Sequence, residues 1–355
     1  MRKTRKYRWL WLFIPLLLVL LYLEGPKPDA PVYDRVMPVV PADPTALENF
    51  IAGHEAVHKL KPDNEARIVW ADSSRKKTPY AIVYLHGFSA SQGEGDPVHR
   101  DIAGKYGCNL YLSRLAEHGI DTADAMVNLT AEKLWSSAQL ALAIGQQLGD
   151  KVILMGTSTG GTLALQLAAA YPDRVAALVL LSPNIAINDP NAWLLNDPWG
   201  LQIAHLVTGS DYIISKDDYG PLYRQYWYPK YRTEAVVQLE EHVETTMNKS
   251  TFQKVRQPVG LFYFYKDKTH QDSTVKVSAE LEMFDELGTP PALKYKKDIP
   301  DAGTHVIGSG IRSHDVPGVE EGIEHFLSDI LHIPARTADS ARPVAGLPGS
   351  PRRHN

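Results

Sequence analysis

Cysteine is almost absent from this chain of 355 residues. With Cys108 as the single cysteine, no intramolecular disulfide can form and no cysteine cage can hold a metal. The sequence also lacks an internal repeat and an apolar run of the ~20 residues that usually span a bilayer. Hydrophobic residues make up 44% and charged residues 22%, the balance of a globular protein, which excludes disorder over most of the chain.

Negative charge outweighs positive charge in the body of the chain. Five basic residues precede residue 9, and the segment from Pro334 onward carries a net charge of +3. Since the whole chain has a net charge of −4, the residues between these two segments carry −12. An acidic body repels phosphate groups instead of releasing counterions from them, which argues against nucleic acid as a partner. No sequence feature indicates an obligate protein partner.

The N-terminus has the layout of a secretory signal or a signal anchor. Basic residues 1–8 precede an apolar run of 15 residues, Trp9–Leu23. The run is short for a bilayer span, but no small-x-small cleavage pattern follows it. We therefore expect an uncleaved anchor in the lipid bilayer, with secretion after signal cleavage as the alternative. Basic flanks stay in the cytoplasm, which places the rest of the chain in the periplasm or outside the cell.

The rest of the chain divides into a linker, a body and a tail. Residues 24–44 contain six prolines, which predict an extended linker. Residues 45–334 carry the apolar segments of one domain. Residues 335–355 are rich in Ala, Arg, Pro, Gly and Ser, with little to bury, and predict a disordered tail.

Strand and helix patterns alternate through the body. Apolar, β-branched or aromatic runs predict strands at residues 81–85, 109–112, 152–155, 175–181, 259–265 and 293–299. Helical patterns cover residues 45–60, 131–148, 159–170, 273–287 and 319–331. This alternation indicates an α/β fold with a mostly parallel central sheet covered by helices on both faces. Residues 184–257 are rich in Trp and Tyr without a clear strand, which predicts a helical cap insertion.

The most informative motif is Gly156-Thr-Ser158-Thr-Gly160. A predicted buried strand runs into this G-x-S-x-G turn and a predicted helix follows at once. The sharp turn strains the backbone at the serine, and the flanking glycines remove side chains that would collide there. The helix N-terminus beneath favours developing negative charge. We predict Ser158 as a nucleophile; the alternative is a packing or phosphate-binding turn.

A serine nucleophile needs a base and an acid that orients it. His305 follows the last predicted strand, which suits the chain order Ser, acid, His that accompanies a G-x-S-x-G turn, and His314 is its nearest rival. The acid should follow the strand predicted at residues 259–265. We favour Asp272, which opens the next helix, and keep Asp267 in the preceding loop as the alternative.

Two backbone N–H groups are candidates for an oxyanion hole. One belongs to Thr159, directly after the nucleophile. The other belongs to Phe88 in the loop His86-Gly87-Phe88 after the strand at 81–85, where Gly87 permits close approach. We expect His86 to brace this loop and take no part in the chemistry.

These segments together resemble the α/β-hydrolase superfamily: Tyr84-Leu-His-Gly-Phe88, Gly156-Thr-Ser-Thr-Gly160, Asp272-x-x-Val275 and Gly303-Thr-His305. Within it, the chain is similar to capped serine esterases and monoacylglycerol-lipase-like hydrolases, whose Leu-x-x-His-Gly segment is matched by Leu115-Ala-Glu-His118-Gly119. The resemblance covers about residues 66–331. It implies a mostly parallel sheet, a helical cap before the acid strand, and no cofactor. Two departures are Thr157, where many relatives carry His, and a longer loop at residues 268–271.

The prediction is a serine hydrolase that cleaves a small apolar carboxylic ester through Ser158, His305 and Asp272, by way of an acyl-enzyme and without metal or cofactor. Esters are favoured over amides because an alkoxide leaves more easily than an amine. A peptidase, amidase or acyltransferase with the same triad stays an alternative, as does an inactive binding module on the same fold.

A rival motif precedes this site. His54-Glu55-Ala-Val-His58 matches the H-E-x-x-H pattern of zinc metallopeptidases, and a helix over residues 45–60 would place both imidazoles on one face. No third ligand follows His58 nearby, and the longer H-x-x-G-x-x-H extension is absent. We keep a zinc metallopeptidase as a further alternative and expect no metal.

Overall fold

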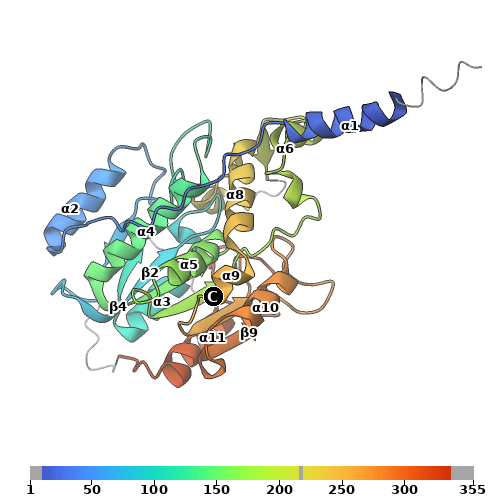
Figure 1. Ribbon diagram of the computed structural model, residues 1–355. Coiled ribbons are helices and arrows are strands. Elements are labelled where there is room, and N and C mark those ends of the chain that lie inside the picture. The colour runs from blue at the N-terminus through green and yellow to red at the C-terminus, as the bar shows by residue number, and fades with distance from the viewer. Residues whose placement is uncertain (1–9, 216–218, 337–355) are drawn as a thin grey trace, which may run out of the picture.

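A seven-stranded sheet forms the centre of the protein (Figure 1), as seen in a computed structural model that describes residues 10–215 and 219–336. Its strands are β1 (Arg67–Val69), β2 (Thr78–Leu85), β3 (Asn109–Leu112), β4 (Gly149–Thr157), β5 (Ala177–Leu181), β8 (Val259–Tyr263) and β9 (Lys294–Asp298). They lie in the order β1-β3-β2-β4-β5-β8-β9. Neighbours pair in parallel except β1, which runs antiparallel to β3. The expected α/β fold class is therefore confirmed.

Helices cover both faces of this sheet. They are α3 (Val98–Tyr106), α4 (Ala131–Leu148), α5 (Thr159–Ala170), α10 (Val277–Glu286) and α11 (Val316–His325), the last continuing as a short π-helix over Phe326–Ile330. Alternate side chains of β2 enter two separate apolar layers. Val83 and Leu85 pack with α4 and α5, whereas Ile82 and Tyr84 pack with α3 and α11. This period of two explains why the strands are apolar on both faces.

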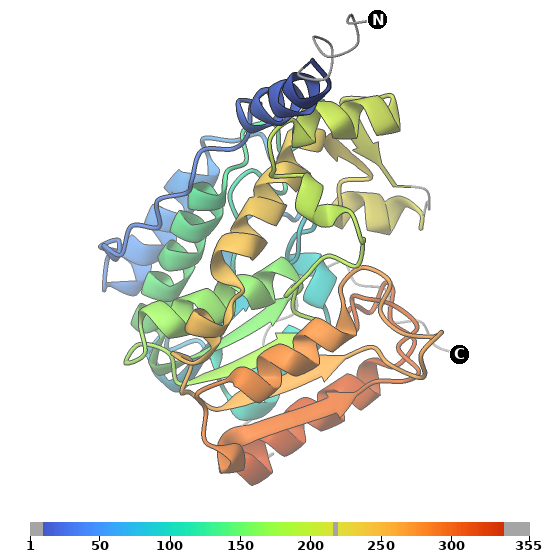
Figure 2. The same cartoon turned by 45° about the vertical axis from the view of Figure 1, so that its right-hand side comes forward.

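The cap insertion leaves the sheet after β5 and returns before β8. Its elements are α6 (Gly200–Thr208), β6 (Tyr212–Ile214), α7 (Pro221–Tyr226), β7 (Lys230–Arg232), α8 (Thr233–Thr246) and α9 (Lys249–Phe252). The expectation of no strand here is wrong, because β6 and β7 form a short antiparallel pair. Each has only three residues, too few for a recognisable alternation. The cap segments α6 and α7 lie together at one end of the molecule (Figure 2).

The N-terminal part contributes α1 (Leu10–Leu23) and α2 (Pro44–Glu55). The side chains of Phe13–Leu23 are exposed, and α1 lies beside α6 (Figure 1), where the Trp199 indole donates a 3.0 Å hydrogen bond to the Leu21 carbonyl. In the part of the chain that is described, no helix combines the length and apolar character needed to cross a membrane.

The segment between α1 and α2 has no helix or strand, as expected, but it lies against the body instead of standing off it. The carbonyl of Asp34 accepts hydrogen bonds from the side chains of Trp135 and Gln139 on α4. The Tyr33 hydroxyl lies 2.7 Å from that of Thr245 on α8. At the other end of the chain, the predicted disordered tail lies outside the described residues from position 337 onward.

Candidate active site

Ser158 occupies the turn between β4 and α5. Its φ of 52° lies in the left-handed region, which a side chain other than glycine adopts only under strain. Its N–H donates to the Leu181 carbonyl at 3.0 Å, and its own carbonyl accepts from the first turn of α5. A side chain at Gly160 would meet the Leu85 carbonyl oxygen, so only glycine fits there. The serine is 7% exposed at the carboxyl edge of the sheet.

His305 and Asp272 form a close pair at the same edge. Asp272 follows β8 and His305 follows β9, the two strands next to each other at this side of the sheet. The Nδ1–H of His305 donates to Asp272 Oδ2 at 2.6 Å. The other carboxylate oxygen accepts from the backbone N–H groups of Thr274 and Val275, at 2.8 and 3.1 Å. Asp272 therefore holds the imidazole and closes the following turn at the same time.

The pair shifts the pKa of each partner. Burial favours the neutral imidazole, but the charge and hydrogen bond of Asp272, with a further contribution from Glu94, outweigh it and raise the pKa of His305. Burial also works against the charge of Asp272, yet His305 and the two backbone N–H groups hold the pKa of this carboxyl below its usual value. The Nε2 atom of His305 is buried and has no hydrogen-bond partner among the described residues, Ser158 Oγ included.

The rival residues lie elsewhere. Asp267 is exposed, and among the described residues it bonds only within its own loop, to Thr269 and His270. These hydrogen bonds lower its pKa without any contact to His305. His314 is exposed as well.

The loop after β2 is held by two buried histidines. The Nε2 atom of His86 accepts from the Leu115 N–H at 3.0 Å, and its Nδ1 bonds the Gly87 carbonyl at 2.9 Å. His118 accepts from the Ser89 N–H at 3.1 Å and stacks edge-on against His86. Burial lowers the pKa of both imidazoles, that of His118 to about 4, so both are neutral braces at neutral pH.

This bracing leaves two backbone donors without an internal acceptor. Among the described residues, neither the Phe88 N–H nor the Thr159 N–H donates to a protein oxygen. Phe88 belongs to the braced loop, and Thr159 is the first residue of α5. Both N–H groups are therefore available for a ligand oxygen.

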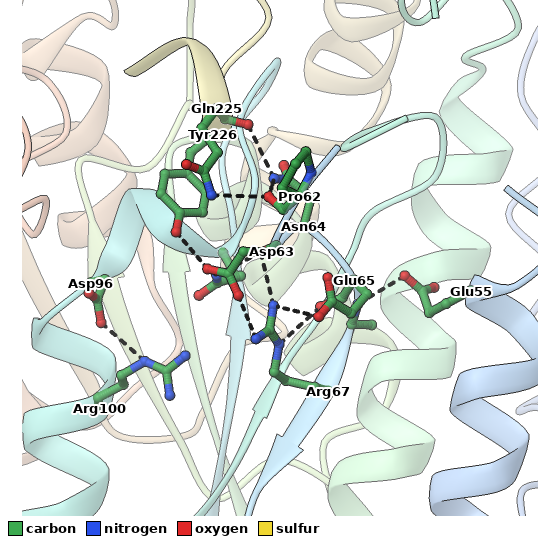
Figure 3. A network of polar contacts seen from close by, with 12 residues as sticks. Glu55, Pro62, Asp63, Asn64, Glu65, Arg67, Asp96, Arg100, Gln225 and Tyr226 are labelled. Carbon is green, nitrogen blue, oxygen red and sulfur yellow. Dashed lines mark hydrogen bonds and ion pairs between the residues drawn. The ribbon is translucent and has the colours of Figure 1, made fainter. Parts of the chain in front are cut away.

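Aromatic residues of the cap contact the same loop. The Tyr228 N–H donates to the Ser89 carbonyl at 2.8 Å, and the Tyr231 ring lies edge-on to Phe88 at 5.3 Å. The C-terminal end of α7 is fixed to the segment before β1, where the Tyr226 hydroxyl donates to Asp63 at 2.5 Å (Figure 3). Asp63 in turn pairs with Arg67 of β1. The cap is thus bonded to the body directly beside the candidate oxyanion loop.

Sequence analysis missed the buried acid beside the candidate oxyanion loop, Glu94, which lies in the 3₁₀ turn Gln92–Gly95. Its Oε2 atom accepts from the Gly87 N–H at 2.5 Å and from the Tyr84 hydroxyl at 3.3 Å. The sequence pattern that could have drawn attention to Glu94 is a charged residue between two glycines. Side chains at Gly93 and Gly95 would overlap the rings of Tyr226 and Tyr84, so both glycines are needed for this close packing.

The H-E-x-x-H segment has no zinc-site geometry. The helix ends at Glu55, so His58 lies beyond it and the expected shared helical face is wrong. Glu55 instead accepts two hydrogen bonds from Arg114, at 2.7 and 3.0 Å. This buried pair, together with the bond from the Ala66 N–H to Glu55, turns the helix end toward the sheet. No group of three or more His, Cys, Asp or Glu in the described residues is arranged to hold a metal ion.

Comparisons with known proteins agree with this architecture. The sequence model of the α/β hydrolase fold family matches residues 80–204. Lipase LipV of Mycobacterium tuberculosis is 49% identical over 49 residues, which is 14% of this chain and only 19% of that relative. A structure from a study of the metagenome-derived lipolytic enzymes LipS and LipT has a TM-score of 0.60 at 16% identity, covering 76% of this chain and all of that one.

A monoacylglycerol lipase of Paleococcus ferrophilus has a TM-score of 0.55 at 14% identity and covers 74% of this chain and 98% of its own. At such identities the solved structures show the fold alone. They share the mostly parallel sheet with flanking helices, and the family model covers the nucleophile turn and the oxyanion loop. The chain therefore has the α/β-hydrolase fold.

Proposed function

We propose that the protein is a serine hydrolase that cleaves carboxylic esters through Ser158, His305 and Asp272. The observation that carries this proposal is the 2.6 Å pair of Asp272 and His305 at the sheet edge where Ser158 ends β4 in a strained turn. Nucleophilic acyl transfer needs an orienting acid, an imidazole and a serine. In this fold the three groups follow the ends of β8, β9 and β4.

In the proposed reaction, Ser158 Oγ attacks the ester carbonyl and His305 Nε2 takes the hydroxyl proton. Asp272 stabilises the imidazolium that forms and keeps Nε2 as the reacting nitrogen. The negative charge on the former carbonyl oxygen is stabilised by the N–H groups of Phe88 and Thr159. The imidazolium then protonates the leaving alkoxide, and water, activated by the same imidazole, releases the acid from the acyl-enzyme.

An apolar ester is the proposed substrate class. Phe88 and the cap residue Tyr231 put aromatic surface next to the candidate oxyanion hole, and aromatic walls favour apolar groups. Among the structural relatives, one is named as a monoacylglycerol lipase and another comes from a study of lipolytic enzymes. No metal or cofactor enters the proposed reaction.

A chain-length series of p-nitrophenyl esters tests the substrate class. We expect kcat/KM to rise from acetate toward medium acyl chains, because each added methylene that is buried contributes about 0.8 kcal/mol. A matched p-nitroanilide series tests the amide alternative. Faster turnover of anilides than of esters would reverse the proposal in favour of an amidase.

We also propose that α1 anchors the protein in a lipid bilayer, with the body on the extracytoplasmic side. The helix exposes apolar side chains from Phe13 to Leu23, a surface that water does not favour. Five basic residues precede it in the sequence, as in proteins whose N-terminus stays in the cytoplasm. Bilayer thinning and snorkelling of flanking basic side chains would accommodate its short length.

A further inference from the structure

Glu94 is a buried acid that the proposed reaction does not use. It is 2% exposed, and no Lys or Arg forms an ion pair with it within the described ranges. Burying a carboxyl group without a cationic partner is unfavourable, so a purely structural acceptor would be better supplied by a neutral side chain. The choice of glutamate here therefore needs an explanation.

The contacts of Glu94 join three parts of the proposed site. Its carboxyl accepts from the Gly87 N–H, one residue before Phe88, and lies near the indole of Trp227 in the cap. It also accepts from the Tyr84 hydroxyl, which in turn lies 3.0 Å from Thr157 Oγ1, one residue before Ser158. The oxyanion loop, the cap and the nucleophile turn thus meet at the side chain of Glu94.

The Gly87 contact determines the direction of the loop. Gly87 and Phe88 have consecutive N–H groups, and Glu94 occupies the first of them. A side chain at Gly87 would lie 2.7 Å from Glu94 Oε1, so the loop and the carboxyl pack without space for a larger residue. With the first donor held, the second keeps a fixed orientation for a substrate oxygen.

Glu94 also lies near His305. The titratable groups that face it are Tyr84 from β2, Tyr223 from α7 and His305 from the loop after β9. Burial raises the pKa of both tyrosines, so they stay neutral at neutral pH. Burial raises the pKa of Glu94 to about 7, while the Gly87 N–H and His305 act in the opposite direction. Glu94 and His305 are therefore the two groups of this cluster whose charges influence each other.

We propose that Glu94 is a positioning residue of the active site: its carboxyl group holds the oxyanion loop at Gly87 and presents negative charge to His305. This inference rests on the proposed serine-hydrolase function. Two separate consequences follow. Loss of the acceptor should disturb the Phe88 donor, and loss of the charge alone should change the proton affinity of His305.

Two substitutions separate these consequences. Glu94→Gln keeps an oxygen that can accept from Gly87 but removes the charge, whereas Glu94→Ala removes both. Glu240→Gln is the matched control, because Glu240 is another buried glutamate whose pKa is raised to about 7 by burial, with Glu244 and Lys276 as its charged neighbours. Thermal unfolding of each full-length variant shows whether it is folded.

The measurement is the second-order rate of fluorophosphonate labelling of the full-length protein between about pH 5 and pH 9. We expect Glu94→Ala to lower the plateau rate by about 10- to 100-fold, less than the about 10²- to 10³-fold cost of removing an oxyanion donor outright, because the Phe88 N–H is displaced and not lost. Glu94→Gln should keep a plateau rate within a few-fold of the wild type. The midpoint of its acidic limb should lie about one pH unit lower, because a nearby negative charge no longer favours the imidazolium. Glu240→Gln should follow the wild-type curve.

A Glu94→Gln curve that superimposes on the wild-type curve would overturn the inference, even if Glu94→Ala fails to fold. A role in stability alone would lower the unfolding temperature without moving the acidic limb. Absence of any wild-type labelling would instead contradict the proposed function, and the inference with it. With an ester substrate, the Glu94→Ala loss should fall on kcat and leave KM nearly unchanged.

Discussion

Asp272 Oδ2 lies 2.6 Å from His305 Nδ1, although 33 positions separate the two residues in the chain. The sheet explains the contact, because β8 and β9 are neighbours and run parallel, so the loops at their carboxyl ends meet. Asp272 is fully inside the protein and its second oxygen is held by two backbone N–H groups. The carboxylate is therefore fixed before any substrate arrives.

Replacement of Asp272 by Asn should reduce kcat for a p-nitrophenyl ester by about 10⁴-fold, because the imidazole loses its orienting acceptor. Asp267→Asn is the matched control. Its exposed carboxylate bonds only within its own loop, so its kcat should stay within about two-fold of the wild type. Equal and small losses in both variants would show that neither acid orients His305.

The acidic limb of kcat/KM should lie above the usual histidine value of about 6.5, because the base acts only when His305 is neutral and its pKa is raised in the folded protein. The same raised pKa also stabilises the folded protein. This contribution to the free energy of unfolding is fully present below the pKa that histidine has in the unfolded chain, and it is lost as pH rises through the pKa of His305 in the folded protein. A pH series of kcat/KM on the wild type checks the limb. An inflection below pH 6 would contradict the geometry of the pair.

Glu55 should prove structural. Breaking its buried pair with Arg114 by Glu55→Ala should lower the free energy of unfolding by about 3 kcal/mol, since an unpaired buried guanidinium is left behind. Denaturant titration measures this loss. Esterase activity per folded molecule should stay unchanged, and prolonged treatment with 1,10-phenanthroline should not reduce it. Loss of activity on chelation that added zinc restores would favour the metallopeptidase alternative.

The proposed anchor makes a prediction about topology. In spheroplasts of a bacterial host that expresses the full chain, added protease should digest the body, because the basic flank is retained inside. N-terminal sequencing of the membrane fraction should find the Trp9–Leu23 run still attached. Recovery of a soluble protein that begins after Leu23 would indicate a cleaved signal. Complete protection from protease would indicate the opposite orientation.

Local pattern was sufficient for the elements with strong apolar periodicity. The bounds of α4, α5 and β3 agree with the expectation to the residue. In α4, the Thr130 side chain accepts from the Lys133 N–H and marks the start, as a helix cap should. Such signals are contained within a few neighbouring residues and need no knowledge of the fold.

Elements that depend on distant partners were not predictable in this way. The three-residue strand β1 was missed because it is defined by its pairing with β3 at the edge of the sheet, and its composition gives no strand pattern. The nine-residue helix α3 was missed because it is short and follows directly on Pro97. The end of α2 at Glu55 depends on Arg114, which lies 59 positions away. Sequence spacing therefore overestimated that helix.

The residues of the candidate site also differ in how far the sequence alone could predict them. Ser158, Asp272 and His305 could be predicted as candidates because their order and their places after strands follow from the expected fold. Glu94 could not be assigned a role, since its contacts come from β2, the cap and the loop after β9, which only folding brings together. Its flanking glycines carried a signal for close packing but none for what lies opposite.

Fluorophosphonate labelling of Ser158→Ala beside the wild type tests the central claim most directly. The variant should fold, because the hydroxyl makes no hydrogen bond to another described residue. The wild type should acquire one covalent phosphonate, located on Ser158 by peptide mass spectrometry, and the variant should acquire none. Ester turnover should fall by about 10⁶-fold, as for loss of other serine nucleophiles. Labelling of the alanine variant at the wild-type rate would contradict the account.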